Sequence, residues 1–341
     1  MTYYELLPYA FKKFSVLRTL RTGLPTVAYK AMGTALPASE KPALFTMNIM
    51  PPMMTLWYHL VRKNLGDRVD TVIFDCSGTL NAADFPGARV QKYVNLYAAT
   101  KSDEFLYRIA RHRKIGWICD DDIFLINPKC IDRIEEEFAD PNTASLSFRS
   151  RDWWHFEING VRYDPSGSYC LALNRTIYCD KEHLSLAPCG GNTRAISHIG
   201  KSLTRFDTFD RANEILLEKG YRCAIVPEKQ RDDLITGFTG VSSAAMLLWH
   251  FRTPQQMLDY LREPEDRRWR GNTLFTVLSG LLAISAVQQM HETITGTPYR
   301  LRAMPTRDDL ERLREEKELL LREGHSFTKT LEVAERLTKL V

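Results

Sequence analysis

The sequence lacks the cysteine patterns of disulfide-rich and zinc-binding proteins. Its seven cysteines are an odd number, and none belongs to a C-x-x-C pair. We therefore expect neither a disulfide framework nor a structural zinc site, and the composition fits a reducing cytosol. The first residues also lack the basic-then-apolar order of a signal peptide, so we expect a cytoplasmic protein.

The sequence has no strong excess of one charge and no internal repeat. Its 46 basic and 42 acidic residues give a formal net charge of +4. That small excess suits anionic substrates or a membrane surface, but it does not indicate a nucleic-acid partner. A chain of 341 residues with 44% hydrophobic content is long enough for one large domain or two ordinary ones.

One long run, from Asn272 to Met290, has no charged residue and is just long enough to span a bilayer. It contains several polar residues, and its apolar residues recur at helical spacing. We expect a buried or surface-lying helix here rather than a spanning one.

The chain divides by pattern into three parts. Residues 1–40 predict a basic amphipathic helical extension followed by a linker, and 271–341 predict a helical segment. Residues 41–270 between them predict an α/β domain with a mostly parallel sheet flanked by helices. The charged helix after residue 305 could serve a homodimer, although it has no sustained heptad pattern.

The α/β domain itself has two halves. Strands and helices alternate in residues 41–128, whereas 129–270 add antiparallel hairpins, with a turn signal at Asn159-Gly160.

A strand ending in Asp75 begins the stretch VIFDCSGTL, residues 72–80. The stretch resembles the D-x-D-G-T signature of phosphatases of the haloacid dehalogenase type, in which the second Asp is the general acid. Ser77 stands at that position and cannot protonate a leaving group near neutral pH. The signature also normally opens its fold, whereas a strand and a helix precede it here. The phosphatase stays an alternative.

Three consecutive carboxylates follow the next predicted strand, IGWIC, at Asp120, Asp121 and Asp122. Ligands bind at the carboxyl ends of the strands in such sheets, so Asp75 and this acidic triplet are expected to face one crevice. Asp120 and Asp122 point to the same side of extended backbone. Their oxygens suit Mg²⁺ or Mn²⁺ that also holds substrate phosphates. A solvated acidic turn is the alternative.

This order of elements, with Asp75 and then DDDIFLINP, resembles the nucleotide-sugar half of a glycosyltransferase of the GT-A fold. The resemblance implies that Asp75, with Ser77 beside it, contacts the nucleotide. It implies that the D-x-D carboxylates, Asp120 and Asp122, bind the metal on the diphosphate, with Asp121 in the same motif. Arg111, on the helix leading into this strand, is a candidate for the diphosphate.

The resemblance continues in the second half, where Gly190-Gly191-Asn192 is followed by FDTFD and a helix-strand pattern ending at Pro227. Inverting members carry a catalytic Asp in an acidic pair here, which implies Asp210, or else Asp207, as the base. An acid that complements a helix dipole is the alternative for either residue.

Further candidates depend on the same resemblance. A downstream His often ligates the metal, which points to His250, although a core histidine is the alternative. Trp153 and Trp154 are candidates to stack on the acceptor sugar. Arg267-Arg268-Trp269-Arg270 could bind a diphosphate or a lipid phosphate, or simply begin a basic helix.

We therefore expect a metal-dependent glycosyltransferase. It would transfer a sugar from a nucleoside-diphosphate sugar to a glycan or lipid-linked acceptor hydroxyl, in polysaccharide or glycolipid assembly. Inversion is favoured. The basic N-terminal helix and the uncharged helix at 272–290 could hold the chain at the inner face of the cell membrane. A sugar-phosphate nucleotidyltransferase is an alternative, but the glycine-rich first loop of that class is missing after the strand at 43–50.

Overall fold

The computed structural model describes residues 16–48, 50–94, 98–192, 194–199, 203–263, 271–322 and 324–341. The predicted Arg267–Arg270 element and residues 1–15 of the N-terminal extension lie outside these ranges. The chain forms two compact units. The sheet unit comprises residues 22–47 and 61–235, and the helical unit comprises the described parts of 1–21, 48–60 and 236–341. The predicted domain boundaries at residues 40 and 270 stay predictions.

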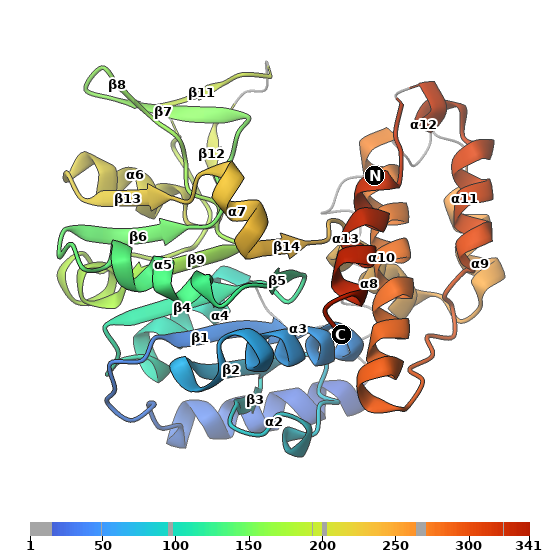
Figure 1. Ribbon diagram of the computed structural model, residues 1–341, viewed down its shortest axis with the longest axis horizontal. Coiled ribbons are helices and arrows are strands. Elements are labelled where there is room, and N and C mark those ends of the chain that lie inside the picture. The colour runs from blue at the N-terminus through green and yellow to red at the C-terminus, as the bar shows by residue number, and fades with distance from the viewer. Residues whose placement is uncertain are drawn as a thin grey trace. The chain divides into compact units, whose positions relative to one another are not determined.

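A seven-stranded sheet forms the centre of the sheet unit (Figure 1). The strands in spatial order are β13 (Arg222–Ile225), β6 (Thr143–Ser147), β9 (Cys170–Asn174), β4 (Ile115–Cys119), β1 (Ala43–Asn48), β2 (Asp70–Asp75) and β3 (Arg89–Lys92). Strand β9 is antiparallel to both neighbours, whereas the pairs β13–β6, β4–β1 and β2–β3 are parallel. The mostly parallel sheet expected from the sequence is confirmed.

The central strands are buried along their whole length, as expected for a sheet covered on both faces. The helices α2 (Val16–Met32), α3 (Pro51–Asn64), α4 (Ala98–Glu104), α5 (Lys129–Glu137), α6 (Asp210–Glu218) and α7 (Glu228–Leu234) connect or precede the strands. A π-helical turn, η3 (Phe105–Ile109), continues α4. Phe105 stacks on Phe45 of β1 at 4.7 Å between ring centroids, and this contact fixes α4 and η3 against the sheet.

A smaller antiparallel region follows β6, as predicted. Strands β11 (Ala195–Ser197), β7 (Trp154–Ile158) and β8 (Val161–Tyr163) form one sheet, and β10 (Cys189–Gly190) pairs with β12 (Arg205–Phe206). Asn159 and Gly160 both have positive φ, 54° and 73°, which the two-residue turn between β7 and β8 requires. Short strands β5 (Ile123–Leu125) and β14 (Ile235–Gly237) complete the set in the described chain.

The helical unit is built around α10 (Gly271–Thr295), which contacts α8 (Val241–His250), α11 (Arg307–Glu316), α12 (Glu318–Arg322) and α13 (Thr328–Thr338). By length and composition α10 could cross a membrane, with a mean hydropathy of 1.4 over its most apolar window. However, 61% of that window is buried in protein, as in the core helix of many globular proteins. The expected buried helix is therefore observed.

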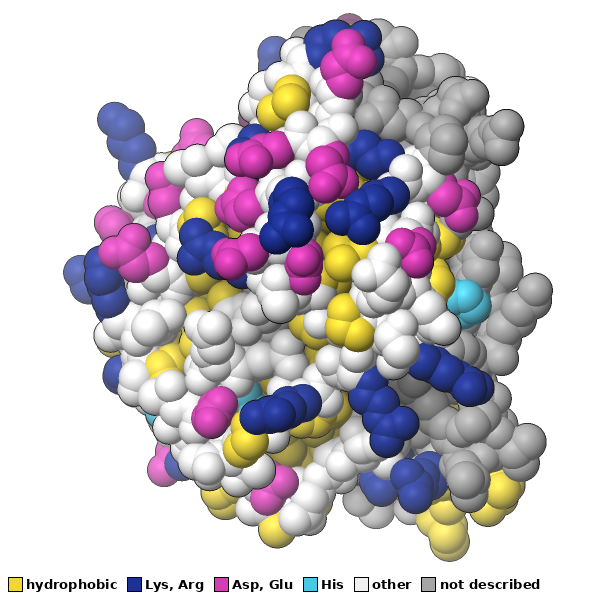
Figure 2. Space-filling view, turned by 90° about the vertical axis from the view of Figure 1, so that its right-hand side faces the viewer, with side chains coloured by type: hydrophobic (Ala, Val, Ile, Leu, Met, Phe, Trp, Pro, Cys, Tyr) yellow, Lys and Arg dark blue, Asp and Glu magenta, His cyan; other side chains and the backbone are white. Residues whose placement is uncertain are grey.

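The charged segment after residue 305 is two helices rather than one. The chain leaves the helical conformation at Lys317, whose Nζ donates to the carbonyl oxygens of Arg262 and Glu263 at the end of α9 (Pro254–Arg262). Leu310, Leu313 and Leu320 are fully buried within the unit. These side chains are therefore not available for the predicted homodimer. Acidic and basic side chains are intermixed over the upper half of the face drawn in Figure 2.

Candidate active site

Strands β1 and β4 are parallel, and β2 begins beside the start of β1, because Asp70 N–H donates to the Pro42 carbonyl at 3.0 Å. The carboxyl ends of β1, β2 and β4 therefore lie at one edge of the sheet. This carboxyl edge carries Asp75 at the end of β2 and Asp120 directly after β4. The two acidic features of the sequence therefore share one edge, as expected.

The acidic triplet is held close to the sheet by backbone bonds. Asp120 N–H donates to the Tyr169 carbonyl at 2.8 Å, and Ile123 N–H donates to the Asp120 carbonyl at 3.1 Å. Asp120 and Asp122 are partly exposed, whereas Asp121 is 8% exposed. Loss of hydration among the packed side chains, together with the neighbouring Asp122 and Asp121 carboxylates, raises the pKa of Asp120 well above its usual range. Loss of hydration likewise raises the pKa of Asp122. Such crowded carboxylates favour a bound cation.

The donor set fits a cation that keeps other ligands. Among the described residues, no group of three or more His, Cys, Asp and Glu side chains is arranged around a common metal position. Mg²⁺ and Mn²⁺ commonly take one or two carboxylates and fill their remaining positions with water and substrate phosphates. Asp120 and Asp122 fit that role. His250 ends α8 in the helical unit, and the metal contact predicted for it stays a prediction.

Lys101 is a basic residue at this edge that the sequence analysis missed. It lies in α4, is 3% exposed, and its Nζ contacts Sγ of Cys76 at 3.6 Å. Loss of hydration and the neighbouring carboxylates raise the pKa of Asp120, and the charge of Lys101 opposes that rise, so the ammonium is within electrostatic range of the triplet. A buried ammonium near the Asp75 loop and the triplet partly compensates the charge of the carboxylates.

Arg111 lies at the other end of β4 from the acidic triplet, and the diphosphate contact predicted for it stays a prediction. Arg111 lies just before β4, at the amino end of the strand, and its Nε donates to His112. A helix that joins parallel strands begins near the carboxyl edge and ends near the amino edge, so its last basic residues face away from the ligand crevice. Arg113 illustrates this, because it pairs with Asp70 at the start of β2 at 2.7 Å.

The Asp75 carboxylate organises its own loop. Its Oδ1 accepts hydrogen bonds from Ser77 N, Ser77 Oγ and Gly78 N at 2.6 to 3.0 Å, and its Oδ2 accepts one from Leu80 N at 3.0 Å. Gly78 has φ of 72°, which this tight turn requires. The nucleotide contact predicted for Asp75 stays a prediction. The residue is 0% exposed, and its carboxylate orders the loop that follows it. The same burial argues against a phosphatase nucleophile.

Ser77 also takes part in this loop rather than facing solvent. It is 6% exposed, and its Oγ lies 2.8 Å from Oγ1 of Thr79. Thr79 is the exposed residue at the tip of the loop.

Of the two predicted base residues, Asp210 begins α6 and Asp207 lies in the turn before it. Asp210 is 3% exposed, and its Oδ1 lies 3.1 Å from Arg151 Nε, while its Oδ2 accepts from Asp207 N–H at 2.8 Å. Arg151, which the sequence analysis also missed, lies in the loop after β6 and pairs with Asp207 through Nη1 at 3.1 Å. Burial raises the pKa of Asp210 to about 6, against the opposing effect of the Arg151 charge.

Tyr169 links this pair to the acidic triplet. Its carbonyl accepts the Asp120 N–H, and its ring lies 5.9 Å from the guanidinium of Arg149, two residues before Arg151. The Arg151 and Asp210 charges both act on the pKa of its phenol. Strands β6 and β4 both run antiparallel to β9, so the loop after β6, which carries Arg151, follows the same end of the sheet as Asp120.

The two tryptophans differ in role. Trp154 is 1% exposed and belongs to a core cluster with Phe156, Ile158, Phe206 and Leu217, so its burial argues against the acceptor contact predicted for it. Trp153 is partly buried against the same cluster, and the acceptor role predicted for it stays a prediction.

Comparisons with known proteins give structural likeness without sequence relatives. No family model and no curated protein sequence matches the chain. The chain is similar in structure to a mannosyltransferase of Pyrobaculum calidifontis in complex with GDP-Man and Mn²⁺, at 14% identity and a TM-score of 0.38 over 98% of this chain and 99% of the other.

Two other solved structures align over shorter stretches. The glycosyltransferase GlyE of Streptococcus pneumoniae TIGR4 aligns at 11% identity and a TM-score of 0.33, over 67% of this chain and 52% of the other. A 4-diphosphocytidyl-2C-methyl-D-erythritol synthase of Anaerococcus prevotii aligns at 8% identity and a TM-score of 0.35, over 57% of this chain and 94% of the other. Likenesses at these identities and TM-scores assign no family, and the fold is established by the strand order itself.

Proposed function

We propose that the chain is a metal-dependent glycosyltransferase that uses a nucleoside-diphosphate sugar. The main support for the proposal is a group of charged side chains at the carboxyl edge of the sheet. This group consists of the acidic triplet, the buried Lys101 and the Arg151–Asp210 pair. In sheets of this class, ligands bind at this edge. A cation and an ammonium side by side suit a diphosphate, and a carboxylate nearby suits a hydroxyl acceptor.

The chain's residues divide the reaction between them. Asp120 and Asp122 would hold Mn²⁺ or Mg²⁺, which when bound stabilises the negative charge of the leaving diphosphate. The ammonium of Lys101 would bind a phosphate oxygen. Asp210 accepts the proton of the acceptor hydroxyl as the new glycosidic C–O bond forms and the bond from the sugar to the diphosphate breaks. A pKa of about 6 keeps Asp210 ionised at neutral pH. One base on one face favours inversion.

The proposed transfer is tested by product analysis. The full chain is incubated with a panel of nucleotide sugars and saccharide acceptors, with Mn²⁺ or with a chelator. We expect nucleoside diphosphate to be released from one donor, only with the metal, and not by Asp122→Asn. The matched control is Asp164→Asn, an exposed carboxylate paired with Arg162 at 3.6 Å. Release of pyrophosphate from a nucleoside triphosphate and a sugar phosphate would instead identify a nucleotidyltransferase.

We also infer that α2 lies on an anionic membrane surface, which would place the enzyme at the inner face of the cell membrane. The helix buries Thr22, Thr26 and Tyr29 on one side. Its opposite side exposes Leu20, Leu24 and Val27 to 49%, 64% and 66%. The flanking Arg21 and Lys30 are exposed as well. An exposed apolar stripe with basic flanks is typical of helices that lie in a lipid interface.

A further inference from the structure

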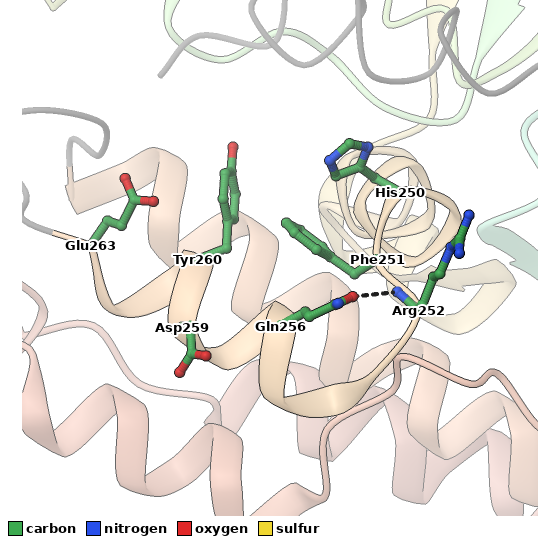
Figure 3. A pocket seen from close by; sticks show the side chains of 7 residues that line it. All are labelled: His250, Phe251, Arg252, Gln256, Asp259, Tyr260 and Glu263. Atoms are coloured by element: carbon green, nitrogen blue, oxygen red, sulfur yellow. Dashed lines mark hydrogen bonds between the residues drawn. The ribbon is translucent and has the colours of Figure 1, made fainter.

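The cavity drawn in Figure 3 belongs to the helical unit and has a volume of about 670 Å³. It lies where α8 ends and α9 begins, and Gln256 Oε1 accepts Arg252 N–H at this junction at 3.0 Å. The ring centroids of Phe251 and Tyr260 in its wall are 5.0 Å apart. These contacts order the junction of the two helices, and we assign no ligand to the cavity.

In the sheet unit, Arg149 lies at the carboxyl edge, level with Asp120. Phe148 N–H donates to the Cys170 carbonyl at 3.0 Å, and Cys170 is also the partner of Cys119 where β4 pairs with β9. Arg149 and Asp120 are the next residues along their chains, so they lie on the two sides of the segment that leads into β9. Neighbouring strands are about 4.8 Å apart, which puts the two backbones about 10 Å from each other.

The strand order gives the order of groups along this edge. Strand β2, which carries Asp75, lies on one side of β4, and β6, which leads to Arg149, lies on the other. In a nucleoside-diphosphate sugar, the diphosphate lies between the nucleoside and the sugar. A donor with its nucleoside near Asp75 and its diphosphate on a cation at Asp120 therefore extends its sugar toward Arg149.

The guanidinium of Arg149 is held beside the ring of Tyr169, with its Cζ 5.9 Å from the ring centroid. The backbone of Arg149 is fixed, because its carbonyl accepts Gly167 N–H and Ser147 Oγ–H, each at 2.7 Å. A Cβ at Gly167 would lie 2.5 Å from Cε2 of Tyr169, so only glycine leaves room for the ring. The ring and the guanidinium are thus ordered before a substrate binds, which lowers the entropic cost of binding.

The charge of Arg149 is not matched by a carboxylate in the described parts of the chain. Arg149 forms no ion pair with those residues, and its Nε is buried with no hydrogen-bond partner among them. Arg151, two residues further on, is paired with both Asp207 and Asp210, at 3.1 Å each. A buried donor without a partner is unfavourable, so the Arg149 guanidinium is suited to an anionic ligand.

The shape of this cation favours a carboxylate. The planar guanidinium offers a fork of N–H groups that matches the two oxygens of a carboxylate. In the proposed reaction, the diphosphate already has the cation and Lys101 as partners. A carboxylate on the sugar would instead meet Arg149, and the C–H face of the same sugar could lie on the Tyr169 ring.

We propose that Arg149 binds a carboxylate of the saccharide substrate, so that the chain acts on acidic sugars of the hexuronate class. The proposal rests on the proposed transfer reaction, which brings a sugar to the edge between the cation and Asp210. The carboxylate belongs either to the transferred sugar or to the acceptor, and each source has its own arm in the test.

Calorimetric titration of the full chain in Mn²⁺ tests the donor. The ligands are UDP, UDP-glucose and UDP-glucuronate, and then GDP, GDP-mannose and GDP-mannuronate. Saturation-transfer NMR without metal or donor tests the acceptor, with disaccharides that end in glucuronate and their glucose counterparts. Within each pair, the two sugars differ only in a carboxylate or a hydroxymethyl group. We expect one acidic sugar to bind roughly 10- to 100-fold more tightly than its neutral partner, the gain from a hydrogen bond to a charged group.

Arg149→Met should abolish this preference and leave the affinities for the neutral sugar and for the nucleoside diphosphate unchanged. Arg149→Lys should keep part of the preference, because the ammonium retains the charge without the planar fork. Arg162→Met, at an exposed ion pair with Asp164, is the matched control and should bind as the wild type does. Thermal unfolding checks that each variant is folded, and Arg149→Lys carries the comparison if Arg149→Met is not.

Three outcomes would overturn the proposal. They are equal binding of acidic and neutral sugars in both arms, a full preference in Arg149→Met, and a loss of nucleoside-diphosphate affinity in Arg149→Met as large as the loss for the acidic sugar. The last would place the guanidinium at the diphosphate. Both arms measure binding and not turnover, and the acceptor arm needs no metal, so this proposal and the transfer reaction can fail separately.

Discussion

The Nε atom of Arg151 lies 3.1 Å from Oδ1 of Asp210, and this ion pair joins the loop after β6 to the first turn of α6. Asp210 is nearly fully buried, and burial alone would favour its protonated form. The guanidinium opposes that effect, and its Nη1 also binds Asp207. Arg151 is therefore a positioning residue that keeps the proposed base ionised.

The pH dependence of transfer tests this role. With the pKa of Asp210 near 6, the rate should fall as pH drops through 6, because the protonated carboxyl cannot accept a proton. Arg151→Met removes the charge that stabilises the ionised carboxylate. The acid limb, which is the fall in transfer rate at low pH, should therefore move up by roughly one to three pH units. Arg151→Lys should restore part of the shift. Arg162→Met, at an exposed ion pair, is the control. An unmoved acid limb in Arg151→Met would contradict the role.

Lys101 should contribute to the affinity for the diphosphate group and not to the affinity for the nucleoside. Lys101→Met should raise the dissociation constant of the nucleoside diphosphate roughly 10- to 100-fold, the loss expected for a hydrogen bond to a charged group. Calorimetric titration with nucleoside diphosphate and with nucleoside alone would measure it. Lys101→Arg should recover part of the affinity, and Lys129→Met, at an exposed site on α5, should have no effect. Equal affinities for wild type and Lys101→Met would exclude the contact.

Some features of the site and the fold could be predicted from the sequence. A residue that directly follows a strand of a parallel sheet lies at the carboxyl end of that strand, so the position of Asp120 could be predicted from the chain alone. The Asn159-Gly160 turn was equally predictable, because few residues adopt its positive φ values. Lys101 could have been found by asking which end of the connecting helix reaches the carboxyl edge.

Other features depend on contacts between distant parts of the chain. Arg151 and Asp210 are 59 positions apart in the sequence, and only the fold brings them together. Asp75 carries the residue type of a ligand contact, but its carboxylate is used by the loop that follows. Burial of Trp154 likewise depends on the packing of β7 against Phe206 and Leu217.

The packing of α8 on α10 should be sensitive to one added methyl group. A Cβ at Gly280 would lie 2.3 Å from the Gly240 carbonyl oxygen, so the helices would have to move apart. Gly280→Ala should therefore destabilise the helical unit by about 1–3 kcal/mol. Ser285→Ala on the same helix should change stability by no more than about 0.5 kcal/mol. Denaturant unfolding measures both, and equal stability of Gly280→Ala and wild type would show that the two helices are not packed this closely.

Membrane contact through α2 should depend on its exposed apolar stripe. The full chain should float with vesicles that contain anionic lipid, and less with neutral vesicles, because Arg21 and Lys30 flank the stripe. A Leu24→Glu, Val27→Glu double substitution should abolish flotation without lowering stability, since both side chains are mostly exposed. A matched pair at an exposed polar site, Glu332→Gln with Lys329→Gln, should float as the wild type does. Flotation of the double variant would exclude α2 as the anchor.

The most direct test of the account is the thermal unfolding of the chain with nucleoside diphosphate and Mn²⁺, alone and together. A ligand that binds only the folded state stabilises it by about 2.7 kcal/mol at a concentration 100 times its dissociation constant. We predict a rise in the unfolding temperature when both are present, and none in Asp120→Asn or Asp122→Asn, with Asp164→Asn behaving as wild type. An equal rise in the Asp122→Asn protein would contradict the proposed site.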